Sequence, residues 1–204
     1  IGALEVPFEP EIVYTRSPGP ELLAGDTDIW AMSADGRRQV QLTATDAYDF
    51  DPAWSPDGTK IAFARSSGGC CSDIYVMDAD GTNVTQVTTG PDPDNAPTWS
   101  PDGTQLAFHS LRNANYDVYK VNVNGTDETR LTTNAAFDWE PDWSPDGTKI
   151  AFASDRASTE EDIYVMNANG SSPVRLTAHP AFDFDPSWSP DGSRIAYQSL
   201  RTGN

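Results

Sequence analysis

One stretch of seven residues occurs four times in this chain and limits what the chain can fold into. Each copy runs from a Pro to the Gly of Trp-Ser-Pro-Asp-Gly, and the copies begin at Pro52, Pro97, Pro141 and Pro186. Successive copies are 45, 44 and 45 residues apart. A fixed repeat of this length predicts an array of similar supersecondary units that stack on their neighbours.

The rest of each unit repeats at matching offsets. After the Gly comes a short apolar run (KIAF, QLAF, KIAF and RIAY), then an Asp with a second apolar run, then Asp-Gly or Asn-Gly, then Leu-Thr or Val-Thr. Such runs, rich in Ile, Val, Phe, Tyr and Trp and bounded by turn residues, predict short strands. Pro-Asp-Gly and Asp-Gly or Asn-Gly predict tight turns between antiparallel strands. We therefore expect four strands in each unit, A to D, and almost no helix.

Both faces of these strands are apolar. In the second unit Ile74 and Val76 point to one side and Tyr75 and Met77 to the other. An antiparallel sheet with one face in water would alternate apolar and polar residues instead. Each sheet must therefore lie between two others, as the blades of a β-propeller do. The recurrent tryptophans are expected to pack between blades, opposite the recurrent alanines (Trp54, Trp99, Trp143 and Trp188; Ala62, Ala107, Ala151 and Ala196).

The consensus WSPDG-x-x-IAF, followed by DIYVM, DG and LT, resembles the repeat of TolB-like β-propellers. It is also similar to the propeller domains beside prolyl-oligopeptidase-type and tricorn-type proteases. The resemblance covers residues 12–199. It implies a propeller that is exported, to the periplasm or the cell exterior, and that often serves as a platform for protein docking.

We expect one domain over residues 1–204. Its units are 12–43 (strands B-C-D), 50–88, 95–132, 139–177 and 184–199 (strands A-B). These seventeen strands exceed by one the sixteen of a closed four-bladed ring. Two explanations remain open: the units belong to a larger ring, or the terminal half-blade pairs with another copy of the chain in a closed oligomer or a filament. If the half-blade is exposed, its bare edges and uncovered apolar face form an association site.

The charge of the chain restricts its partners. There are 31 acidic and 13 basic residues, a net charge of −18. A surface this negative repels nucleic acid and anionic membranes and favours cations or a basic partner. No apolar run is long enough to span a bilayer. The two cysteines, Cys70 and Cys71, are adjacent in a loop: two thiols, a vicinal disulfide and a crosslink to another chain all remain open.

Acidic residues just before each strand A are the best candidate for a ligand site. They are Asp49, Asp51, Asp94, Asp138, Glu140, Asp183 and Asp185. Because the D-to-A connection of a propeller runs from the rim to the axis, we expect these carboxylates to gather at one mouth of the channel. Clustered carboxylates without imidazole or thiolate suit Ca²⁺. The alternative is that each Asp accepts backbone N–H bonds in a local turn.

No catalytic set is recognisable. The two histidines, His109 and His179, occupy non-equivalent positions, and no Gly-x-Ser-x-Gly elbow occurs. A Ser or Asp could pair with His109, but His109 reads better as a packed or solvated variant of its counterparts Ala64, Ala153 and Gln198. We therefore expect a non-enzymatic protein-interaction or self-assembly module. Two alternatives remain: the non-catalytic gating propeller of a prolyl-oligopeptidase-like or tricorn-like hydrolase, and a carbohydrate or polyuronate enzyme that acts through the acidic mouth, which mutation of Asp138 and Asp183 would test.

Overall fold

The computed structural model describes residues 11–17, 27–68, 71–112, 114–157 and 159–201. These residues form strands and turns and contain no helix, as the sequence predicts. Within them, no helix long and apolar enough to cross a membrane is found. The strands are β1 (Ile12–Arg16), β2 (Asp28–Met32), β3 (Gln39–Gln41), β4 (Tyr48–Trp54), β5 (Lys60–Ser66), β6 (Asp73–Asp78), β7 (Thr85–Gln86), β8 (Asp94–Trp99), β9 (Gln105–Arg112), β10 (Asn115–Asn122), β11 (Thr129–Arg130), β12 (Asp138–Trp143), β13 (Lys149–Ser154), β14 (Asp162–Asn167), β15 (Val174–Arg175), β16 (Asp183–Trp188) and β17 (Ile195–Ser199).

These strands pair in chain order into five antiparallel sheets. We call them blades 1 to 5: β1-β2-β3, β4-β5-β6-β7, β8-β9-β10-β11, β12-β13-β14-β15 and the half-blade β16-β17. The expected fold class is confirmed, with four-stranded blades and a surplus half-blade. The state of the cysteine pair stays open, because Cys70 lies outside the described residues.

The Pro-Asp-Gly turn joins the first two strands of a blade, and its residues form the bonds that such a turn needs. In blade 2 the Ser55 hydroxyl donates to Asp57 Oδ1, and the same oxygen accepts the backbone N–H of Thr59. Gly58 closes the turn at a φ of 68°, a left-handed value that favours glycine. The repeated motif therefore fixes this connection locally.

Each inner blade buries both of its faces, as the apolar pattern predicts. In blade 2, Ile74 and Val76 pack toward Trp99 of blade 3. On the opposite face, Phe63 and Met77 pack against blade 1. Trp99 lies in one cluster with Ala62, and Trp143 lies in one cluster with Ala107. The expected stacking of tryptophan on the alanine of the neighbouring blade is therefore confirmed for these pairs.

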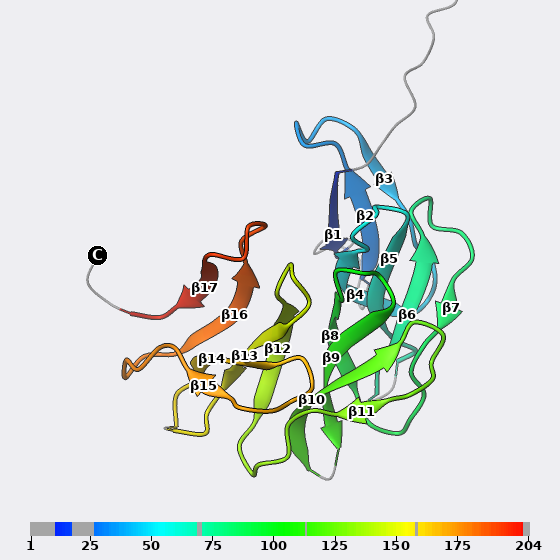
Figure 1. Ribbon diagram of the computed structural model, residues 1–204. Helices are drawn as coiled ribbons and strands as arrows, with labels where there is room; N and C mark the ends of the chain where they lie inside the picture. Colours follow the sequence, from blue (N-terminus) through cyan, green and yellow to red (C-terminus); the bar gives the residue numbers. More distant parts are fainter. Residues whose placement is uncertain (1–10, 18–26, 69–70, 113, 158, 202–204) are drawn as a thin grey trace, which may run out of the picture.

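The blades follow one another round an open arc, from β1–β3 (blue) to β16 (orange) and β17 (red) in Figure 1. Each blade packs on the next in chain order, and the first strands β4, β8, β12 and β16 contact one another in turn along the inside of the arc. Among the described residues, β16 and β17 make no substantial packing contact with blade 1. The arc therefore has two free ends.

Candidate functional site

The inner strands carry an irregularity that exposes one residue of each to the axis. The pairing of β4, β8, β12 and β16 with the next strand shifts in register just before the repeated turn motif. The residue at the shift has a positive φ and precedes a proline: Asp51 (51°), Ala96 (49°), Glu140 (51°) and Asp185 (57°). These residues line a channel of about 320 Å³ together with the small residues that follow them. This arrangement is a β-bulge, which commonly redirects a side chain.

The four leading acids of the candidate set do not reach this channel. Asp49, Asp94, Asp138 and Asp183 are fully buried and each forms an ion pair with an arginine at or just after the end of the neighbouring strand: Arg65, Arg112, Arg156 and Arg201 respectively. Arg156 Nη2, for example, lies 2.8 Å from Asp138 Oδ1. Its guanidinium also stacks over Phe152 and Tyr164. This placement differs from the expectation that all seven carboxylates gather at one mouth.

The Asp–Arg pairs are structural, because a buried carboxylate needs a charged partner in place of water. The sequence signal was available: an Arg lies at or just after the end of the second strand in these four units, but its link to the Asp is visible only once the strands are paired. The same burial makes Asp138 and Asp183 poor candidates for acid–base chemistry on a polysaccharide.

Two of the other three acids, Asp51 and Glu140, bond across blades, whereas Asp185 Oδ2 accepts a hydrogen bond from Gln198 Nε2 within the half-blade. Asp51 Oδ2 accepts the backbone N–H of Ala96 at 3.2 Å, and Glu140 Oε2 accepts that of Asp185 at 2.7 Å. Each carboxylate therefore caps the bulge residue of the next blade. The capping that the sequence left open does occur, but it links neighbouring blades instead of closing a local turn.

His109 completes this series where an acid is missing. Blade 3 has Ala96 at the bulge, which cannot accept the N–H of Glu140. That N–H instead donates to His109 Nδ1 at 3.2 Å. Burial lowers the pKa of His109 to about 4, so its ring is neutral and able to accept a hydrogen bond at pH 7. The packed interpretation of His109 therefore agrees with the structure.

The channel disfavours the charged forms of Glu140 and Asp51. Burial raises the pKa of the Glu140 carboxyl to about 7, and the nearby charges of Asp185, Glu161 and Asp51 act in the same direction. The N–H of Asp185 opposes this rise. The pKa of Asp51 is raised chiefly by burial as well. These two carboxyls, Asp51 and Glu140, have a raised pKa because their charged forms are poorly solvated.

Calcium binding at these residues stays a prediction. Of the seven candidate ligands, only Asp51, Glu140 and Asp185 line the channel. Within the described residues, no group of three or more His, Cys, Asp or Glu side chains is arranged to hold a metal ion. The donor set therefore offers carboxylate oxygens of the type that Ca²⁺ prefers, but not the number in one place that a Ca²⁺ site commonly has.

A second candidate site lies at the free end of the arc, between blade 4 and the half-blade. This tail groove has a volume of about 390 Å³ and apolar walls that include Ile163, Leu176, Trp188, Ile195 and Tyr197. Leu176 is 53% exposed, whereas its counterparts in the inner blades, Val87 and Leu131, are 6% and 7% exposed. The groove therefore marks the place where a third and a fourth strand would extend the half-blade and cover Leu176 of blade 4.

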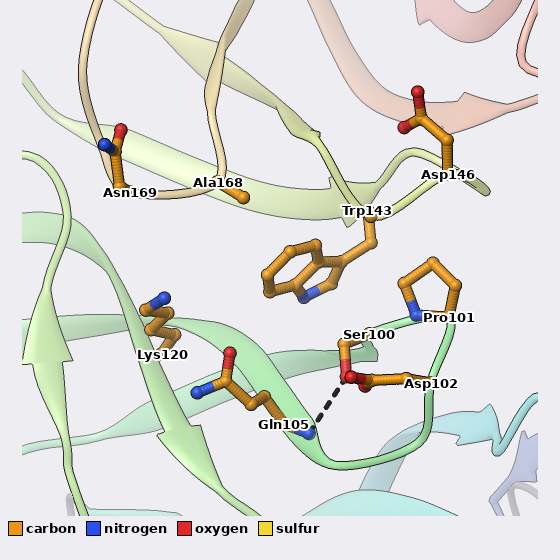
Figure 2. A pocket seen from close by; sticks show the side chains of 10 residues that line it. Ser100, Pro101, Asp102, Gln105, Lys120, Trp143, Asp146, Ala168 and Asn169 are labelled. Atoms are coloured by element: carbon orange, nitrogen blue, oxygen red, sulfur yellow. Dashed lines mark hydrogen bonds between the residues drawn. The ribbon is translucent and has the colours of Figure 1, made fainter.

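A groove between two complete blades shows what the tail groove lacks. Figure 2 shows the indole of Trp143 between the Ser100–Gln105 turn of blade 3 and Ala168 and Asn169 of blade 4. The nearby carboxylates are occupied within their own turns: Asp102 accepts from Ser100 and Thr104, and Asp146 from Ser144 and Thr148. This groove is therefore a seam between packed blades, and Trp143 is covered by both.

Comparison with known proteins agrees with this architecture. The family profile described as the Tricorn protease N-terminal β-propeller domain matches residues 70–160 and 113–204, more than half of the chain. TolB from Acinetobacter baumannii superposes with a TM-score of 0.83 at 26% identity, over 94% of this chain and 48% of that one. Putative TolB from Agrobacterium tumefaciens gives 0.78 at 27% identity, over 93% and 70%. This chain thus spans about half the length of the A. baumannii protein.

More distant likenesses concern the fold alone. An oligogalacturonate lyase in complex with manganese superposes with a TM-score of 0.68 at 16% identity, over 88% of this chain and 54% of that one. Comparison with curated proteins gives no match. The repeated blades, the profile match and the TolB superpositions lead to one assignment: the chain belongs to the TolB-like β-propellers, in the family of the Tricorn protease N-terminal propeller domain.

Proposed function

We propose that this chain is a non-enzymatic protein-interaction module whose tail groove is completed by strands of another polypeptide, and that it assembles with copies of itself in this way. One observation carries the proposal: the half-blade leaves apolar surface uncovered that every inner blade buries. β13 is buried along five of its six residues, whereas four of the five residues of its counterpart β17 are exposed.

The free edge of β17 supports the same conclusion. Of the strands that the structure describes, β17 pairs only with β16, so its outer backbone N–H and C=O groups are available to a further strand. Exposed strand edges bind other chains by adding a strand to the sheet, with pockets for alternate side chains giving specificity. Apolar walls beside a bare edge are what such a strand requires.

A peptide that carries the missing strands tests this function. The segment 161–177 of the chain itself supplies the third and fourth strands of blade 4, with Tyr164 and Met166 in the apolar seam. We expect saturable binding of this peptide to the chain by calorimetry. A peptide with Tyr164→Asp and Met166→Asp is the matched control and should not bind. Equal binding of both peptides, or of neither, would contradict the proposal.

A second candidate function is the gating propeller of a hydrolase. The profile match to a propeller domain of Tricorn protease favours it. In that case the natural gene product should carry a hydrolase domain on the same polypeptide, which mass measurement of the native protein would reveal. Activity on peptides would then reside in that domain and survive mutation of Glu140.

Export and calcium binding belong to the same proposal. The TolB-like assignment supports a periplasmic or extracellular protein, and the acidic residues before each strand A supply carboxylate oxygens of the kind that would bind a stabilising Ca²⁺. Calorimetric titration of chelator-treated protein with Ca²⁺ tests the metal, because a ligand that binds only the folded state raises its stability. No heat and no rise in melting temperature would dismiss it. Cell fractionation tests the location.

A further inference from the structure

A backbone contact that recurs between the inner blades has one of its two partners at each end of the arc. Between inner blades, a turn glycine of one blade lies against a backbone carbonyl of the blade before it. A Cβ at Gly81, Gly125 or Gly170 would lie 2.6, 2.8 or 2.5 Å from the carbonyl oxygen of Leu42, Val87 or Leu131 respectively. Blade 1 has the same glycine, Gly36, and within the described part of the chain no atom lies within 4 Å of a Cβ placed there. At the other end, no glycine among the described residues lies against Leu176 in this way.

We propose that the tail groove receives the β2–β3 hairpin of a second copy of this chain, so that β17 pairs with β2 of that copy in the place of β1. This inference rests on the proposed function and names the partner of the same site. The resulting blade would have the order β16-β17-β2-β3, which is the order of every complete blade. Gly36 of the second copy would then lie on the carbonyl of Leu176.

The side chains of β2 match the groove. Tyr164 and Met166 of blade 4 pack with Leu131 and Trp143 in the seam between blades 3 and 4. The residues at the same positions of β2 are Trp30 and Met32, both only partly buried in blade 1. In the groove they would meet Leu176 and Trp188, the counterparts of Leu131 and Trp143. Contact between the two copies would thus bury apolar surface of Trp30 and Met32 in one copy and of the groove in the other.

β1 is the strand best placed to be exchanged. None of its residues is buried, whereas the equivalent strands of the inner blades, β5, β9 and β13, bury four or five residues each. It pairs with β2 from Ile12 opposite Met32 to Arg16 opposite Asp28. β17 repeats the pattern of β1, with Ile195 and Tyr197 at the positions of Ile12 and Tyr14. Replacing β1 by β17 leaves every other strand in a four-stranded blade.

The contact is heterologous, since the head of one copy meets the tail of the next. Such contacts close into rings or continue as filaments, depending on the rotation between copies. Both products are larger than a monomer and both require Gly36 and Leu176. The inference therefore makes one demand on solution behaviour, which is association through these two residues.

Sedimentation velocity of the 204-residue chain over a wide range of concentrations, in reducing buffer, tests the inference. We expect the wild-type sedimentation coefficient to rise with concentration. Gly36→Asn should remain monomeric, because asparagine tolerates the φ of 71° while its Cβ would collide with the Leu176 carbonyl. Gly103→Asn is the matched control, with a φ of 68° and open space around it, and should associate like the wild type.

A second pair of variants probes the tail. Leu176→Asp should abolish association. Val174→Asp, on the same strand and 58% exposed, should not, because the positions equivalent to Val174 are exposed in the inner blades too. A wild-type monomer at all concentrations, or association of Gly36→Asn equal to that of Gly103→Asn, would overturn the inference. If the 161–177 peptide still bound, completion of the tail groove by a strand of another polypeptide would stand, and self-assembly through the β2–β3 hairpin would be wrong.

Discussion

Single residues in the channel show how one departure from the repeat is matched by another. Asp51 and Glu140 each cap the bulge residue of the next blade, and Ala96 cannot. His109 takes over as acceptor, although its counterparts are Ala64, Ala153 and Gln198. The sequence shows both departures, in the same unit, but only the pairing of β8 with β9 brings Asn95 opposite His109 and so explains them.

A double-mutant cycle tests this account. His109→Ala should lower the free energy of unfolding by about 1–3 kcal/mol, because the N–H of Glu140 loses its buried acceptor. Adding Ala96→Asp should restore much of this loss by supplying the carboxylate that other blades have, and Asp also tolerates the positive φ there. Urea unfolding of the four proteins measures the coupling. Strictly additive effects would show that the two positions are independent.

Glu140 should make stability fall as the pH rises. Its pKa in the fold is about 7, against an ordinary value of 4.5. The folded chain therefore holds this proton more tightly than the unfolded chain, and stability is lost as pH rises from about 4.5 to about 7. Glu140→Gln keeps an acceptor for Asp185 N–H and removes the titration.

The measurement is the difference in urea midpoint between wild type and Glu140→Gln across that range. His109, with its lowered pKa, acts in the opposite direction and is present in both proteins. Asp51, Asp185 and Glu161 are also unchanged between them. The advantage of the variant should therefore grow toward pH 7, and a constant difference would show that Glu140 ionises normally.

At the scale of strands and turns, most of the fold was predictable. Strands with apolar residues on both faces predicted stacked sheets, and Pro-Asp-Gly and Asn-Gly predicted the turns. The β-bulges were not predictable. Their only mark in the sequence is a residue that precedes a proline, and such a residue is equally typical of a loop. For the same reason the sequence merged Asp49 and Asp51 into one candidate site, whereas the strand pairs the first with Arg65 and directs the second into the channel.

Replacing a turn glycine by alanine should cost more stability where the backbone of a neighbouring blade lies close to the new Cβ. Gly103→Ala should cost about 1–2 kcal/mol, the penalty for an alanine in the left-handed region. Gly125→Ala should cost more, because its φ is also positive and its Cβ would lie 2.8 Å from the carbonyl oxygen of Val87. Thermal unfolding of both variants makes the comparison. Equal costs would mean that blades 2 and 3 do not meet as described.

At the scale of the whole molecule, the described sheets follow one another round an arc, and the first and last of them make no substantial contact. The sequence predicted the surplus half-blade by counting strands, but not which surfaces it leaves bare. That required the burial of Leu176 to be compared with Val87 and Leu131, and the surroundings of Gly36 with those of Gly81. The charge of −18 sets a condition on association, since copies repel one another at low salt.

Hydrogen exchange along the chain, measured at low and at high protein concentration, tests the central claim most directly. If the half-blade is completed by another polypeptide, exchange of the β17 amides should slow as concentration rises, while the β13 amides, already inside a complete blade, exchange at a constant rate. Gly36→Asn should abolish the concentration dependence at β17. Fast exchange at β17 at every concentration, in a chain whose inner blades are fully protected, would contradict the account.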